Sequence, residues 1–260
     1  MIPAGFAGVE NMLWLWMVAM IRPGAAFIAA PIFGAAFVPV QLRLIIALAI
    51  GIPALGATGF TLPAAGLASI DGFMLIAGEV AAGLALGFAV QIGFSAAMLA
   101  GEVIGAAMGL SFAAMVDPAS GQQNPVLSQF LSIVATLLFL AVNGHLALAA
   151  IIVESYRALP PGNAWMTAES IHGLVLFGGV LFSAGLSIAL PVGFAIIIVQ
   201  LVMAMLARSA PQLNLFAVGF PAALMAGIVL LAVAAPVIGE GILAAIDLGL
   251  EQSRRMAAGG

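Results

Sequence analysis

The feature that most constrains this chain is a succession of apolar runs, most of them about 20 residues or longer, between Met12 and Ile238. A helix of about 20 apolar residues spans a hydrocarbon core about 30 Å thick, because its backbone groups pair within the helix. Only 6% of the residues are charged and 65% are hydrophobic, whereas about one quarter of a soluble domain is charged. The chain is therefore predicted to be an all-α integral membrane protein.

The runs predict about six to seven hydrophobic helices. Short connections containing Pro, Gly, Asn or Asp separate the runs, and no segment between them is long enough to bury a core of its own. We therefore expect one membrane domain over residues 1–260. The expected helices cover 12–30, 42–62, 73–115 (as two passes or one bent hairpin), 126–152, 174–206 and 213–238.

Prolines interrupt several of these runs, and each one removes a backbone N–H and favours a kink. They are Pro23, Pro31, Pro39, Pro53 and Pro191. At membrane depth, the carbonyls freed by such breaks need partners in protein or in a wet cavity. We therefore expect kinked helices that are buried against other chains of an assembly.

Glycines recur at a spacing that places them on one helix face, where another backbone can approach closely. One set is Gly101, Gly105 and Gly109, and another is Gly83 and Gly87. The spacing alone does not distinguish packing within this chain from packing against a partner helix. Both interpretations stay open from the sequence.

Two acidic residues, Glu79 and Glu102, each follow a glycine inside an apolar run. An ionisable group in a membrane segment costs at least about 2–3 kcal/mol unless it is paired or hydrated. The carboxylates either form a proton or ion pathway, or accept hydrogen bonds from a neighbouring subunit at a helix end or interface.

Arg22 and Arg43 are interpreted as boundary residues that reach a polar layer or neutralise a neighbouring acid. His145 is interpreted as a hydrogen-bonded packing residue.

Composition and motifs exclude several classes of function. The formal charge of −4, with 6 basic residues in the whole chain, is too sparse to attract nucleic acid. There is no cysteine, no HExxH zinc helix, no Walker glycine loop and no GxSxG nucleophile motif. Ser183 and Ser187 have no base in register, so their hydroxyls are expected to bond to carbonyls of their own helix. We expect a structural subunit with lipid as a partner, without enzyme activity, metal or cofactor.

The most informative stretch runs from Gly101 to Gln129, where a polar loop lies between two apolar runs. Pro118 disfavours helix at Asp117, and Gly121 permits a positive φ. One interpretation is an ordinary hairpin turn outside the membrane. The other is a re-entrant or plugging loop, in which bulky, flexible apolar side chains close a pore against water. The candidate pore residues are Phe112, Met115, Asp117, Pro118, Gly121, Asn124 and Pro125.

An ordered set of motifs over almost the full length resembles the FliR family. Members of this family are subunits of the flagellar type III protein export gate. The strongest element is Pro211-Gln212-Leu213-Asn214, within a block from Ala207 to Pro221. Each element is weak alone, but their order is specific. The others are Arg22-Pro23, Pro31-Ile32-Phe33-Gly34, Pro39 with Arg43, Gly101-Glu102 with Gly105 and Gly109, Asp117-Pro118 with Asn124-Pro125, and Asn143-Gly144-His145.

The resemblance implies a hetero-oligomeric helical assembly at the bacterial inner membrane, within the flagellar basal body. There the subunit joins FliP and FliQ and forms a conduit for unfolded flagellar proteins. FlhB and FlhA belong to the same machinery, and the proton motive force and a cytoplasmic ATPase supply the energy. The resemblance also implies that the helices form hairpins stacked on other subunits, partly outside the bilayer plane.

Residue roles follow from the same resemblance. The loop from about Phe112 to Pro125 corresponds to the pore plug of the family, and Phe112 and Met115 correspond to part of its apolar closure. Met115 stands where an aromatic residue is expected, which departs from the family pattern. Subunit packing is assigned to Gly101, Gly105, Gly109, Arg208, Pro211, Gln212 and Asn214.

Two other functions stay open. The homologous export subunit of virulence injectisomes shares much of this pattern, although Asn143-Gly144-His145 and Gly219-Phe220-Pro221 look more like the flagellar branch. A small secondary transporter, from a different class of protein, would also have broken helices and buried acids. A stable partnership with FliP and FliQ would distinguish the export subunit from the transporter.

Overall fold

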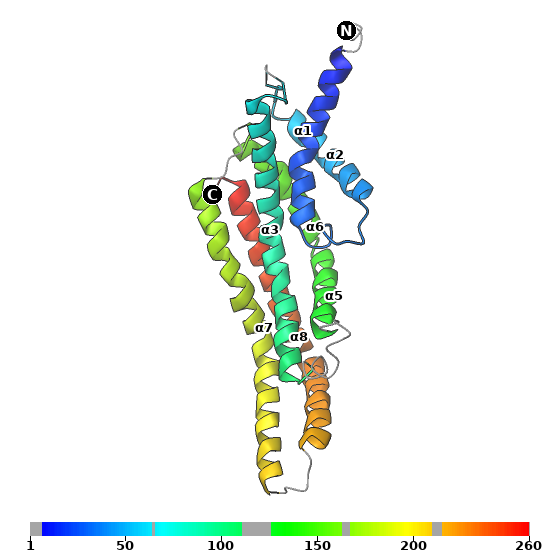
Figure 1. Ribbon diagram of the computed structural model, residues 1–260, viewed down its shortest axis with the longest axis vertical. Helices are drawn as coiled ribbons and strands as arrows, with labels where there is room; N and C mark the ends of the chain where they lie inside the picture. Colours follow the sequence, from blue (N-terminus) through cyan, green and yellow to red (C-terminus); the bar gives the residue numbers. More distant parts are fainter. Residues whose placement is uncertain (1–6, 64–65, 111–125, 163–166, 210–214, 260) are drawn as a thin grey trace. The chain divides into compact units, whose positions relative to one another are not determined.

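A computed structural model of the chain describes residues 7–63, 66–110, 126–162, 167–209 and 215–259. Within these ranges the chain forms seven helices and no strand (Figure 1), which confirms the predicted all-α class. Four of these helices are long and apolar enough to cross a membrane, and α5 with α6 would make a fifth span. The helices are α1 (Ala7–Ala29), α2 (Val40–Gly56), α3 (Ile70–Ala107), α5 (Val126–Ala141), α6 (Gly144–Ala158), α7 (Ala168–Ser209) and α8 (Leu215–Ala257).

The described helices depart most from the predicted ranges in three places. The segment 73–115 was expected to hold two passes or a bent hairpin, but α3 runs without a break to Ala107. The single helix expected over 126–152 is instead divided into α5 and α6 at Asn143, which has a left-handed φ of 56°. The last helix was expected to end at Ile238, but α8 continues to Ala257 through a polar, charged segment with helical propensity.

The prolines act in two ways. Pro39 stands at the N-cap of α2 with an extended backbone, and Pro31 follows the end of α1. Pro23, Pro53 and Pro191 lie inside helices that continue past them. The first two prolines therefore mark helix boundaries, as expected of a residue without an N–H, whereas the other three leave carbonyls that need other partners.

Three helices are much longer than a bilayer is thick. Helix α3 has 38 residues, α7 has 42 and α8 has 43. At 1.5 Å per residue these lengths are about 57 to 65 Å, roughly twice the thickness of a hydrocarbon core. Each of these helices can therefore cross a bilayer and also extend beyond it.

The contacts divide the chain into two compact units, to which α3, α7 and α8 each contribute a part. The first unit comprises Met1–Ile92, Leu140–Gly178 and Asp247–Gly260. The second comprises Gly93–Phe139 and Gly179–Ile246. The prediction of one membrane domain over the whole chain stays a prediction.

In the first unit, glycines let α1 approach its neighbours at backbone distance. A Cβ atom on Gly83 of α3 would overlap the Arg22 carbonyl oxygen, and one on Gly87 would overlap the Ala26 carbonyl oxygen. Gly51 of α2 approaches α1 in the same way, and Figure 1 shows α1 and α2 side by side. The face formed by Gly83 and Gly87 is therefore used for packing within this chain.

In the second unit, α7 and α5 pack closely against the last part of α3. Gly185 of α7 lies against Ala96 and Leu99, where an added Cβ would come within 3.0 Å of the Ala96 carbonyl oxygen. Gly101 of α3 lies against the backbone of α5 at Ser128, with 2.5 Å between the position of an added Cβ and the Ser128 Cα. This packing places the end of α3 next to the start of α5.

Candidate functional site

A buried ion pair joins α1 to α3 in the first unit. Arg22 donates two parallel hydrogen bonds to the carboxylate of Glu79, from Nε to Oε2 at 2.9 Å and from Nη2 to Oε1 at 2.7 Å. Both side chains are 0% exposed. Such a pair is tolerated in an apolar interior only where its geometry is good and its remaining polar atoms are hydrogen-bonded.

Helix α6 provides the remaining contacts of the guanidinium. Nη1 of Arg22 donates to Ser155 Oγ at 3.0 Å, and Nη2 donates to the carbonyl of Leu159, just past the end of α6, at 2.7 Å. The Cζ atom lies 4.1 Å from the centroid of the Tyr156 ring. With both bonds to Glu79, four of the five N–H groups of Arg22 have acceptors, and the aromatic ring lies on its face.

Arg22 was predicted to reach a polar layer or to neutralise a neighbouring acid. In the structure it pairs with an acid, Glu79. Glu79 has its partner within this chain, whereas the sequence allowed an ion pathway or a bond from a neighbouring subunit. Ser155 and Tyr156 could not be recognised from the sequence, because they lie 133 and 137 residues from their partners in α1. We call Arg22, Glu79, Ser155 and Tyr156 the polar cluster.

Tyr156 also compensates for a proline. Pro23 has no N–H, so the carbonyl of Ala19, four residues earlier, lacks its usual helical donor. The hydroxyl of Tyr156 donates to this carbonyl at 3.3 Å, and both residues are buried. The expectation that a freed carbonyl would find a partner in protein is confirmed at this proline, and the partner belongs to the same chain.

The other polar residues predicted to lie in apolar surroundings are more dispersed. Glu102 is exposed on α3. Arg43 donates from Nη2 to the Ala35 carbonyl at 2.6 Å, in the segment that precedes α2. Arg43 Nε and His145 Nδ1 are buried without a hydrogen-bond partner in the part of the chain that the structure describes. The hydroxyls of Ser183 and Ser187 bond to carbonyls of α7, as predicted.

In the second unit, α3 ends in a Schellman motif. Gly109 has a φ of 80°, which a residue without a Cβ adopts readily. Its N–H donates to the Ala106 carbonyl at 3.0 Å, and the N–H of Leu110 donates to the Gly105 carbonyl at 3.0 Å. Gly105 and Gly109, predicted to pack against other helices, therefore also define where α3 stops.

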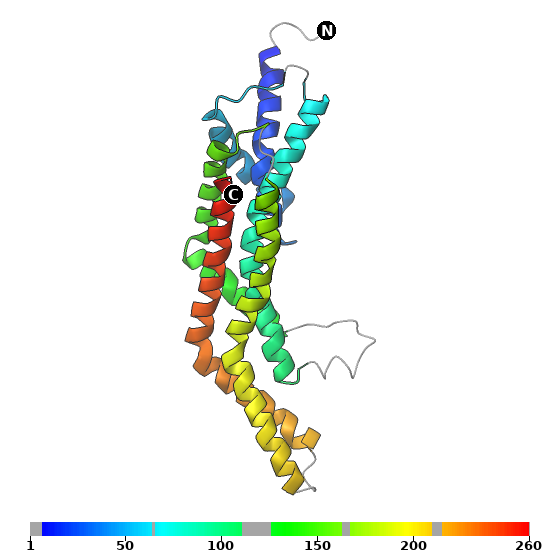
Figure 2. The same ribbon diagram turned by 90° about the vertical axis from the view of Figure 1, so that its left-hand side faces the viewer.

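Two further side chains hold this helix end. Gln200 of α7 donates from Nε2 to the Ala107 carbonyl at 2.6 Å. Met108 lies against Gly227 of α8, where an added Cβ would come within 2.6 Å of the Met108 Cε. Figures 1 and 2 both show the end of α3 beside α7 in this unit. Sequence reasoning missed Gln200, because its acceptor is a backbone atom 93 residues away.

The start of α5 is attached to α3 close by. Ser128 donates from Oγ to the Met98 carbonyl at 2.9 Å, and Gly101 packs on the backbone of Ser128. The described residues on either side of segment 111–125 are thus fixed to one another within the second unit.

Most of the predicted pore and packing residues lie outside the described residues. Arg208 is exposed in the last turn of α7, and Gly101, Gly105 and Gly109 have the contacts given above. Those outside the described ranges are Phe112, Met115, Asp117, Pro118, Gly121, Asn124, Pro125, Pro211, Gln212 and Asn214.

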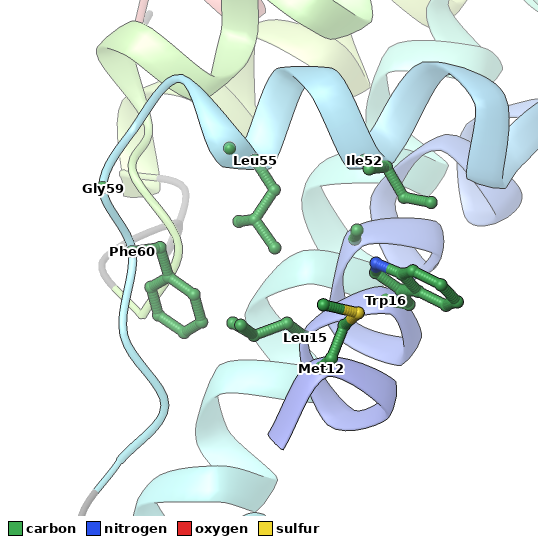
Figure 3. Close-up of a pocket in the computed structure, with 9 residues that line it drawn as sticks. Met12, Leu15, Trp16, Ile52, Leu55, Gly59 and Phe60 are labelled. Atoms are coloured by element: carbon green, nitrogen blue, oxygen red, sulfur yellow. The ribbon is translucent and has the colours of Figure 1, made fainter. Parts of the chain in front are cut away.

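An apolar pocket lies between α1 and α2 in the first unit (Figure 3). Met12, Leu15, Trp16 and Ala19 line it from α1, and the remaining lining comes from α2 and the residues after it, including Leu55 and Phe60. Its volume is about 270 Å³, and none of its lining side chains is charged. The pocket therefore suits an apolar group rather than an ion.

The comparisons with known proteins cover most of the chain. The family model described as bacterial export proteins, family 1, matches residues 13–248. The flagellar biosynthetic protein FliR of Escherichia coli (strain K12) is 37% identical over 228 residues, covering 87% of this chain and 85% of the relative. That of Bacillus subtilis (strain 168) is 28% identical over 248 residues, covering 94% of each chain. This chain belongs to the bacterial export proteins, family 1, the family of the flagellar FliR proteins.

Proposed function

We propose that this chain, a multi-pass membrane subunit of the flagellar protein export apparatus, forms part of the wall of the export conduit. Its partners in the wall are FliP and FliQ, with FlhB and FlhA as neighbours and unfolded flagellar proteins as cargo. The observation that carries this proposal is the family match over residues 13–248, together with the match to a FliR protein at 37% identity over 87% of the chain. The site of action is the bacterial inner membrane, in the flagellar basal body.

Large exposed apolar side chains support a role in an assembly within the membrane. On α7, Phe182 and Phe194 are 65% and 62% exposed, and Val233 on α8 is 75% exposed. These side chains need lipid or other subunits as their surroundings, because large apolar patches on soluble surfaces mark interaction sites. We propose that FliP, FliQ and lipid share these faces.

We propose further that the subunit is structural and not catalytic. Arg22 and Glu79 bond to each other, and Arg22 also bonds to Ser155 of α6, so the pair serves the packing of three helices. This also disfavours the secondary transporter, in which a buried carboxylate such as Glu79 would be available to bind an ion.

The proposed closure of the conduit is the segment from Phe112 to Pro125. Its two flanks support this assignment, because the end of α3 and the start of α5 are both fixed within the second unit. Phe112 and Met115 provide the apolar side chains that exclude water from a closed pore.

The wall assignment is tested by expressing the chain with FliP and FliQ and weighing the purified particle by native mass spectrometry. We expect one complex that contains all three proteins. A homo-oligomer without FliP and FliQ would contradict the assignment and favour a transporter.

The plug assignment needs a separate test on the assembled complex. Deletion of residues 119–124 is expected to raise the ion conductance of membranes that contain the closed complex. The control is the undeleted complex at equal density in the membrane. An unchanged conductance in a complex of normal composition would contradict the assignment.

A further inference from the structure

We propose that the apolar pocket between α1 and α2 holds one acyl chain of a membrane phospholipid. The site lies within the first unit, and all of its lining residues are described. The proposal rests on the location of this protein in a membrane and not on the conduit or its closure. It is carried by the chemistry and size of the pocket, by its shape along α1 and by the position of its open end.

The first observation is the chemistry and the size of the pocket. None of its nine lining residues is charged, and Trp16 is the one among them whose side chain has an N–H or O–H group. The volume is about 270 Å³, whereas an apolar cavity of about 150 Å³ takes up one benzene molecule. Pockets that enclose a whole drug-sized ligand begin at about 300 Å³. The pocket therefore suits an apolar segment of a larger molecule.

The second observation is the shape of the pocket. Met12, Leu15 and Ala19 line it from one stripe of α1, which extends over about 10 Å of the helix axis. Figure 3 shows Phe60, on the segment after α2, opposite Met12 and Leu15, and it shows Leu55 of α2 across one end. A single side chain of a partner helix fills a hole between four residues. A pocket that follows a helix for two turns suits an extended hydrocarbon chain better.

The third observation is that the pocket deepens in one direction. Met12 is 51% exposed, whereas Leu55 and Ala19 are 5% and 1% exposed. The pocket is therefore open at Met12 and closed at Leu55 and Ala19. An occupant enters from the Met12 end.

The open end lies at the level where α1 enters the membrane. The apolar span of α1 is Gly8–Ala29, and its 22 residues make a helix about 33 Å long. Because this is close to the thickness of a hydrocarbon core, about 30 Å, the first turn of the span lies at the edge of the core. The exposed polar residues Glu10 and Asn11 lie there, and Met12 follows directly.

This level selects a lipid as the occupant. The acyl chains of a phospholipid begin at the edge of the hydrocarbon core and run inwards from it. The pocket begins at the same edge, at Met12, and runs inwards along α1 to Ala19. An acyl chain therefore fits with its carboxyl end at Met12 and its methyl end towards Ala19 and Leu55.

Packing supplies the driving force. An acyl chain gains no hydrophobic free energy when it moves from the bilayer into the pocket, because lipid tails are as apolar as the lining. An empty pocket, however, would leave the surrounding side chains without contacts on one side. The chain restores these contacts. Since α1 and Phe60 flank it, the bound chain is expected to exchange more slowly than the surrounding lipid.

The test uses phosphatidylcholine with a photoactivatable diazirine on one acyl chain, either near the methyl end or near the glycerol. The full chain, purified with FliP and FliQ, is reconstituted into vesicles of phosphatidylethanolamine and phosphatidylglycerol that contain a small fraction of this lipid. After irradiation, peptide mass spectrometry locates and counts the adducts. Leu55 reports occupancy of the pocket, because it is 5% exposed and lines the closed end. Ile45 of α2 is 63% exposed and lies outside the lining, so it reports ordinary lipid contact.

Two variants obstruct the pocket from different sides. Gly56→Phe adds a ring at a lining residue where nothing lies within 4 Å of an added Cβ. Met12→Trp enlarges the side chain at the open end. Gly8→Phe is the matched control, because an added Cβ at Gly8 also has open space around it, but Gly8 lies outside the lining.

In the unchanged protein, we expect adducts at Leu55 from the lipid labelled near the methyl end and at Met12 from the lipid labelled near the glycerol. Gly56→Phe and Met12→Trp should each lower the adducts at Leu55 several-fold and leave those at Ile45 unchanged. Gly8→Phe should change neither.

Normal labelling of Ile45 without adducts at Leu55 would overturn the proposal. So would adducts at Leu55 that persist in both obstructed variants. A protein occupant is detected by replacing Leu55 with the photoreactive residue benzoylphenylalanine, and cross-links to FliP or FliQ instead of lipid would also overturn the proposal. If no complex with FliP and FliQ forms, the wall assignment fails, but the full chain reconstituted alone still tests the pocket by the same adducts.

Discussion

The hydroxyl of Tyr156 donates to the carbonyl of Ala19 at 3.3 Å, although the two residues lie 137 positions apart in the chain. This carbonyl lacks its helical donor because Pro23 has no N–H. The same tyrosine ring lies on the guanidinium face of Arg22. One side chain of α6 therefore stabilises both Arg22 and Pro23, in the second half of α1.

Tyr156→Phe should destabilise the protein by about 1–3 kcal/mol, because a buried carbonyl loses its partner. The phenyl ring keeps its contact with Arg22. In a Pro23→Ala background the same change should cost less, because the new residue can supply the missing N–H to Ala19. Thermal unfolding of the four proteins of this double-mutant cycle, purified in detergent, measures the coupling. Equal losses in both backgrounds would show that the phenol and the proline act independently.

Removal of one charge of the buried ion pair should destabilise the protein more than removal of both charges. Glu79→Ala leaves Arg22 as an unpaired buried charge, which costs about 3–5 kcal/mol. The double change Arg22→Met with Glu79→Met removes both charges and should recover most of that loss. Unfolding in detergent and the amount of protein in membranes are the measurements.

The control for this pair is Glu251→Gln, which affects the exposed ion pairs of Glu251 with Arg254 and Arg255 at the end of α8. Exposed pairs contribute little to stability. A double variant as unstable as Glu79→Ala alone would mean that the polar cluster contributes more than charge pairing.

Glycine substitutions should separate packing within the chain from packing against a partner. Gly83→Ala is expected to destabilise the isolated chain, because the added Cβ overlaps the Arg22 carbonyl. At Gly179 of α7 nothing lies within 4 Å of an added Cβ. Gly179→Ala should therefore stabilise the isolated chain by about 0.5–1 kcal/mol. If Gly179→Ala weakens the complex with FliP and FliQ in native mass spectrometry, a partner helix lies at that position.

The C-terminus is expected to face the cytoplasm, because Arg254 and Arg255 lie in the last turn of α8 and basic residues favour that side. A reporter enzyme that is active only in the periplasm should be inactive when fused after Gly260. A matched fusion to a reporter that works only in the cytoplasm should be active. The opposite result would reverse this orientation.

The sequence predicted well where the helices occur, but it did not predict which contacts hold the helices together. Apolar runs long enough to span a bilayer located all of the described helices, because length and hydropathy are local properties. The break at Asn143 was missed because the apolar pattern continues through it, although Asn-Gly is a common breaker. The charged end of α8 was missed because the hydropathy of the sequence falls after Ile238, whereas its helical propensity does not.

The site shows the same contrast. Arg22 and Glu79 were recognisable because a charge in an apolar run is conspicuous. Their pairing was not, since nothing in either segment specifies which distant helix lies beside it. Tyr156 and Gln200 were missed for a related reason: each donates to a backbone carbonyl, and any residue in a chain can offer one.

The ion pair between Arg22 and Glu79 has a consequence for how this protein is made. During synthesis α1 emerges before α3. Arg22 of α1 is therefore made before its partner Glu79, which lies 57 residues later in the chain. An unpaired arginine at a helix centre opposes insertion into lipid by about 2.5–3.5 kcal/mol. Helix α1 is therefore expected to stay beside the insertion machinery until α3 arrives, so that the two helices enter the bilayer as a neutral pair.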